Sequence, residues 1–118
     1  VLVKGIEALT AECFSAATIA GVADEVAASL DASQTKDGWK HQAAYNMERM
    51  TTHGIRRAAE MREVAITLAD LKIAGRMTTG TIAWQDQLGH LGLSLLDTEG
   101  LEPRFSAIHS ALDNKKSD

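Results

Sequence analysis

The chain has 118 residues, which is enough for one domain with a hydrophobic core and too few for two. Hydrophobic residues make up 45% of it but aromatic residues only 4%, and proline occurs once, a composition typical of an all-helical protein. The net charge of −4, with no basic cluster beyond Lys115-Lys116 near the end, argues against nucleic acid as a partner.

The location of the protein is indicated by what the sequence lacks. No stretch approaches the ~18 to 20 uninterrupted apolar residues of a membrane span, and no signal peptide begins the chain, so we expect no membrane partner. The single cysteine, Cys13, lies on an apolar helix face and favours a reducing, cytoplasmic compartment. Because the chain opens at Val1 within an apolar-periodic pattern, we expect it to be a fragment of a longer protein.

Helical periodicity organises the first half of the chain. Residues 2–20 form an amphipathic pattern that Gly21 closes, and Asp24 and Glu25 suit the first turn of a short helix ending near Asp31. A polar loop is predicted over residues 31–38, followed by a third helix over residues 39–50. We expect the run Thr51-Thr52-His53-Gly54 to break that helix.

The central helix is predicted to span residues 51–75 and to be buried on most sides, with Gly75 as its left-handed C-terminal residue. Its apolar face is formed by Ala58, Met61, Val64, Ala65, Leu68 and Leu71, widened by Ile66, Ala69 and Ile73. The opposite strip, expected to be solvated, holds Arg56, Glu60, Glu63, Thr67 and Asp70.

The last part of the chain reads as two helices and a connection. Thr78 or Thr79 could cap a helix that ends by Gly92, residues 93–100 form a connection, and Pro103 opens a last short helix. Residues 113–118 are expected to be disordered. The sequence thus predicts an all-α protein, a compact bundle of five or six helices.

Several kinds of site are not supported by the sequence. None of the nine glycines lies in the strand-loop-helix context that cradles a dinucleotide phosphate. The four histidines are isolated from one another and from Cys13, so we predict no metal site. No strand-turn-helix elbow is present to expose a nucleophilic serine.

The most notable charged run is His53-Gly54-Ile55-Arg56-Arg57, followed by Glu60-Met61-Arg62-Glu63. At a helix N-terminus these cations would oppose the helix dipole, so something should compensate them. One interpretation is an anion site in which Arg56 or Arg57 binds a carboxylate or phosphate. The other, which we favour because structural ion pairs are commoner, is pairing with Glu60, Glu63 or Glu48.

Arg57 stands out within that run because it projects into the apolar arc of the predicted central helix. An unpaired guanidinium there would cost several kcal/mol. We therefore expect Arg57 to have a partner, either an internal carboxylate or that of a substrate.

Three segments together resemble a known family: Lys4-Gly5-Ile6-Glu7-Ala8-Leu9, Ala20-Gly21-Val22-Ala23-Asp24, and the run from His53 to Ala65. Over residues 1–93 the chain looks like the helical C-terminal domain of bacterial NAD(P)-dependent oxidoreductases similar to 6-phosphogluconate dehydrogenase and 3-hydroxyisobutyrate dehydrogenase. In that family a Rossmann domain binds NAD or NADP, and the helical domain completes the substrate cleft and forms much of the dimer.

The resemblance implies a division of the chain. Residues 1–93 would be the substrate and dimerisation domain, residues 94–118 a C-terminal extension with one short helix, and His53, Arg56, Arg57 and Glu60 the substrate-binding candidates. The catalytic lysine that the family places early in the first long helix would lie upstream of Val1. Ala59 stands where another family lysine approaches the nicotinamide, so we expect no cofactor to be bound by this chain alone.

The leading hypothesis is therefore part of an NAD(P)-dependent hydroxyacid-type dehydrogenase, inactive without its Rossmann domain. The rival is a free-standing helical module that binds partner proteins through its apolar faces. In either case, helices this apolar in so short a chain predict a homodimer, with the first helix near the interface.

Overall fold

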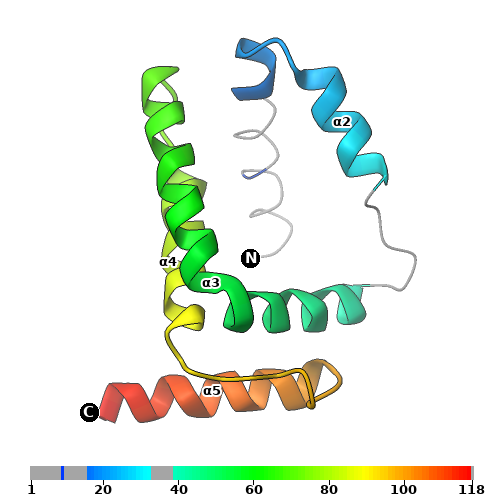
Figure 1. Cartoon of the computed structure of the whole chain (residues 1–118), viewed down its shortest axis with the longest axis vertical. Coiled ribbons are helices and arrows are strands. Elements are labelled where there is room, and N and C mark those ends of the chain that lie inside the picture. Colours follow the sequence, from blue (N-terminus) through cyan, green and yellow to red (C-terminus); the bar gives the residue numbers. More distant parts are fainter. Residues whose placement is uncertain (1–8, 10–15, 33–38, 118) are drawn as a thin grey trace.

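The computed structural model describes residue 9, residues 16–32 and residues 39–117, and all regular secondary structure in these ranges is helical. The predicted all-α bundle is confirmed. After the end of a first helix at residues 16–19 come α2 (Ala23–Ala32), α3 (Trp39–Asp70), α4 (Arg76–Gly89) and α5 (Leu101–Ser117). Figure 1 shows α4 alongside the upper half of α3 and α5 across the base, with α2 on the other side of the molecule.

The first helix ends where the sequence predicts. Gly21 adopts φ +75°, its N–H donates to Thr18 O at 3.1 Å, and the N–H of Val22 donates to Ala17 O at 2.9 Å. These two hydrogen bonds form a Schellman motif, which requires a left-handed residue at the glycine position. α2 then begins with Asp24 and Glu25 in its first turn, as predicted, and none of its residues is buried.

The predicted break at residues 51–54 is wrong, because α3 is a single helix of 32 residues that runs through it. Figure 1 shows that this helix bends sharply near its middle. The buried Thr51 hydroxyl donates to Glu48 O at 3.1 Å, a side-chain bond to the preceding turn of the kind that bends helices. The local helix-breaking signal therefore produces a bend rather than an end.

The C-terminus of α3 also differs from the prediction, since the helix ends at Asp70 and not at Gly75. Lys72 is the left-handed residue, with φ +63°; its N–H donates to Ala69 O and the N–H of Ile73 to Leu68 O. This is a second Schellman motif, here without glycine. Gly75 instead lies at the N-cap of α4.

α4 begins at Arg76, earlier than the predicted cap at Thr78 or Thr79. The Thr79 hydroxyl donates back to Gly75 O at 2.9 Å, within the helix rather than at its start. α4 crosses α3 where Gly54 meets Gly89: a Cβ added to Gly54 would lie 2.8 Å from Gly89 N, and one added to Gly89 would lie 2.5 Å from Ile55 N. The two backbones touch at this crossing.

The hydrophobic core of the described residues lies where α3, α4 and α5 meet. Leu88, Leu95 and Ile108 are buried there, with Met47 and Met50 packed against them. Leu95 and Ile108 thus share a core with α4, although both follow the domain end predicted at residue 93; the division into a domain and an extension stays a prediction. The helix α5 continues through residues 113–117, so the predicted disorder there is wrong.

The central part of α3 is less buried than predicted. Ala58 and Leu68 are buried, but Val64, Ile66 and Ala69 of the predicted apolar face are exposed. The strip from Arg56 to Asp70 that was expected to be solvated is exposed, as predicted. No helix among the described residues is long and apolar enough to cross a membrane.

Candidate functional site

Four basic side chains share one flank of α3, and we call them the basic stripe: Arg49, His53, Arg56 and Arg57. Arg49, His53 and Arg57 are spaced four residues apart, so they align along the helix within α3. The stripe lies in the interior of a continuous helix, so the predicted position at a helix N-terminus is wrong. No free backbone N–H groups are available there to help bind an anion.

Two of these cations have an internal counter-ion. Arg56 Nε lies 3.6 Å from Glu60 Oε1, with both side chains about two-thirds exposed. Arg49 donates to Glu48 through Nε and Nη2 at 2.5 and 2.6 Å. The favoured interpretation, internal ion pairing, is therefore confirmed for Arg56, while Glu48 pairs with its neighbour Arg49, a residue that the sequence analysis did not single out.

Arg57 differs from the other two arginines. Its side chain is half-buried, and it makes no ion pair or hydrogen bond with any other described residue. The predicted internal carboxylate partner is therefore not found in this part of the protein. A half-buried guanidinium keeps its full capacity to bind a planar anion through two parallel hydrogen bonds.

His53 is half-buried between these arginines. Burial lowers the pKa of His53, and the positive charges of Arg49, Arg56 and Arg57 lower it further, whereas Glu48 opposes them. The imidazole is therefore held in its neutral form near neutral pH. Three arginines and two paired glutamates leave the stripe with one positive charge in excess, which suits a small anion.

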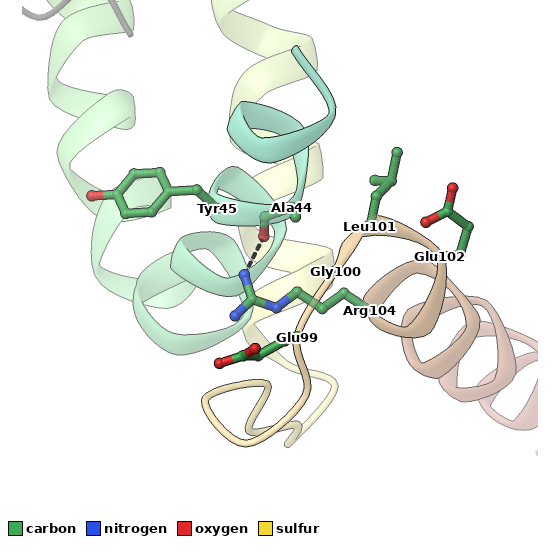
Figure 2. A pocket seen from close by; sticks show the side chains of 7 residues that line it. All are labelled: Ala44, Tyr45, Glu99, Gly100, Leu101, Glu102 and Arg104. Carbon is green, nitrogen blue, oxygen red and sulfur yellow. Dashed lines mark hydrogen bonds between the residues drawn. The ribbon is translucent and has the colours of Figure 1, made fainter. Parts of the chain in front are cut away.

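A hollow of about 560 Å³ lies elsewhere, between the first half of α3 and the start of α5 (Figure 2). Arg104 reaches into it and donates to Ala44 O at 2.7 Å and to Thr98 O at 2.5 Å. These contacts tie α5 and the preceding connection to α3, so Arg104 has a structural role. Glu99 and Glu102 line the same hollow, and their carboxylates make it unsuitable for an anion.

A second hollow, of about 480 Å³, is found at the C-terminus of α4. Asp86 in its wall lies 3.6 Å from Arg62 and 3.4 Å from His90, and Lys115 donates to His90 O at 2.8 Å. Lys115 therefore satisfies a carbonyl at the helix end, as cations do there. The Arg62 side chain is more than half exposed.

The described residues do not form a metal or dinucleotide site. No group of three or more His, Cys, Asp or Glu side chains that could hold a metal ion occurs among them. A dinucleotide phosphate needs a loop between a strand and a helix, and the regular structure in this part of the chain is helical throughout. The described residues therefore contain no phosphate-binding loop of the kind that holds a nicotinamide dinucleotide.

Fold and site together define a small all-helical domain with a basic stripe along its longest helix. The chain belongs to the family described as "Domain of unknown function (DUF1932)", whose model matches residues 17–88, more than half of the chain. That match covers the end of the first helix, α2, α3 with the whole stripe, and α4 to Leu88, and it leaves out α5. No curated protein and no solved structure matches the chain.

Proposed function

We propose that this chain is the C-terminal substrate-binding and dimerisation domain of a cytoplasmic, NAD(P)-dependent hydroxyacid-type dehydrogenase, as its resemblance to the 6-phosphogluconate dehydrogenase-like enzymes implies. Its own contribution would be to hold the carboxylate of a small hydroxyacid at Arg57. The observation that carries this proposal is the half-buried Arg57, which no acidic side chain of the described residues neutralises. A carboxylate substrate would supply the missing counter-ion.

The other candidates take lesser parts in the proposal. His53 borders Arg57 and offers a neutral imidazole, while Arg56 and Glu60 neutralise each other at the solvent edge and frame the site. The nicotinamide would supply the hydride chemistry from a separate Rossmann domain. No described residue of this chain takes part in that step.

A free-standing interaction module is the second candidate, and the exposed apolar side chains of the helices favour it. These include Ile19, Leu30, Ile55, Ile66, Trp84 and Leu96. The coding sequence upstream of Val1 discriminates the two functions. A strand followed by Gly-x-Gly-x-x-Gly supports the dehydrogenase, and an upstream region without it supports the module.

Arg57→Met tests the substrate role, because methionine keeps the apolar stem and removes the bidentate contact. In the protein that carries this chain with its cofactor domain, we expect kcat/KM for the hydroxyacid to fall by ~10²-fold or more, with Tm nearly unchanged. Arg56→Met is the matched control, since Arg56 is exposed and already paired, and it should reduce kcat/KM much less. Unchanged kinetics in Arg57→Met with a clear fall in Tm would contradict the proposal.

A further inference from the structure

His53 lies one helical turn from Arg49 on one side and one turn from Arg57 on the other. The two arginines differ in a way that matters for a ligand: Arg49 is held by Glu48, whereas Arg57 is without a counter-ion among the described residues. An anion bound by Arg57 would therefore lie beside the imidazole of His53. We propose that anion binding at the basic stripe is coupled to protonation of His53, so that the site binds its anion more tightly as the pH falls.

The charges around His53 determine the direction of this coupling. Among the described residues, the charged groups that act on His53 in the free protein all belong to α3: three arginines, and Glu48 in opposition. Arg104 of α5 acts on Glu48, and Asp86 of α4 is engaged with Arg62 and His90. The net charge that acts on His53 is therefore positive.

A bound anion would change that balance. It would offset the arginines and favour the imidazolium, so the pKa of His53 is higher in the complex than in the free protein. Linkage then requires the reciprocal effect: binding takes up a proton, and affinity rises as the pH falls through the range between the two pKa values. With one coupled proton, the affinity for the anion changes by at most tenfold per pH unit.

This coupling rests on the proposed function only in using the same anion site. It adds that the site responds to pH and that His53 is the responding group. His53 acts here as a positioning residue with a variable charge, and it donates no proton to a substrate.

Sulfate is the probe of choice, because it remains a dianion at every pH used and so adds no titration of its own. The 118-residue chain is titrated with sulfate from about pH 8 to about pH 5.5, a range that brackets the ordinary histidine pKa of about 6.5. NMR of the His53 ring gives its pKa with and without saturating sulfate. We expect sulfate to raise that pKa and the affinity to increase at least threefold toward the acidic end.

Variants separate this inference from the proposed function. His53→Gln should retain sulfate binding near pH 8 and lose its dependence on pH, whereas His109→Gln, which removes an exposed histidine of α5 paired with Asp113, should keep that dependence. If Arg57→Met binds sulfate as the parent does, or if the parent binds none at any pH, the anion site itself is refuted. If Arg57→Met weakens sulfate binding, two further results would overturn only the coupling. One is a parent affinity that does not change with pH, and the other is a pH dependence that persists in His53→Gln.

Discussion

Glu48 is the one acidic side chain buried in the core of the described residues, at 4% exposure. The hydrogen bonds from Arg49 lower its pKa, burial opposes them by raising it, and the charges of Arg49, Arg104 and His53 lower it further. The carboxylate is therefore ionised in the folded state, and it links the basic stripe to the Arg104 contact that holds α5. Removing this one charge leaves several cations without compensation.

Glu48→Gln is expected to lower the free energy of unfolding near pH 7 by about 2 kcal/mol, less than the loss of a fully buried pair because Arg49 retains contact with water. A carboxyl with a lowered folded-state pKa stabilises the protein above its unfolded value of about 4.3, and that contribution is lost as the pH falls through the folded-state pKa. The difference between parent and variant in urea unfolding should therefore be full at pH 7 and shrink below about pH 4.

The control for this prediction is Glu60→Gln, which removes an exposed ion pair with Arg56. It should change the unfolding free energy by less than about 0.5 kcal/mol at either pH. Equal effects of the two substitutions would mean that the burial of Glu48 contributes nothing.

At the scale of the elements, the crossing of α3 and α4 depends on two glycines. The peptide atoms of Gly54 and Gly89 are so close that a Cβ on Gly54 would collide with the carbonyl oxygen of Gln85 and lie 2.9 Å from the Cα of Gly89. Both obstacles are backbone atoms, which cannot rotate away as a side chain can. The helix pair must separate to admit even one methyl group.

Gly54→Ala is therefore expected to destabilise the protein by about 3 kcal/mol, although alanine is the better helix former. Gly80→Ala is the matched control on α4: nothing lies within 4 Å of its added Cβ, so the substitution should stabilise by about 0.5–1 kcal/mol. Thermal unfolding should therefore show a lower Tm for Gly54→Ala, and a higher Tm for Gly80→Ala, than for the parent protein. A stabilised Gly54→Ala protein would show that the helices do not approach each other as the structure has them.

At the scale of the whole molecule, large apolar side chains of the described residues lie exposed on several elements. Ile19 and Val22 near the end of the first helix, Trp84 of α4 and Leu96 after it are each at least 41% exposed. A second copy of the chain can cover apolar surface of this kind.

We therefore expect sedimentation at micromolar concentration to give a homodimer of twice 12.7 kDa, with the first helix at the interface. Ile19→Glu, at the 59% exposed end of that helix, should raise the dimer dissociation constant by ~10-fold or more. Thr18→Glu places the same charge one residue earlier, at an exposed polar position, and should change the dimer dissociation constant little. A monomeric parent protein, or equal effects of the two substitutions, would contradict the prediction.

Signals that act over a few residues could be read from the sequence alone. Gly21 ends the first helix because a left-handed residue is needed there, and Asp24 and Glu25 begin α2 because their charges suit a helix N-terminus. The connection over residues 93–100 and the first-turn position of Pro103 follow from local backbone preferences in the same way. The sequence alone also predicted the helical class, the solvated strip of α3 and the basic run at His53–Arg57.

The tertiary structure decided what depends on contacts between distant residues. Gly54 interrupts a helix by its local preference, yet α3 continues through it because Gly89 of α4 packs against that position. Pairing in the stripe was likewise undetermined, since Glu48, Glu60 and Glu63 were all within reach of an arginine by spacing. The structure pairs Glu48 with its neighbour Arg49 and Glu60 with Arg56. Among the described residues, Arg57 is left without a counter-ion for the same reason: sequence spacing limits which charges can meet, but the packing of the helices selects which of them do.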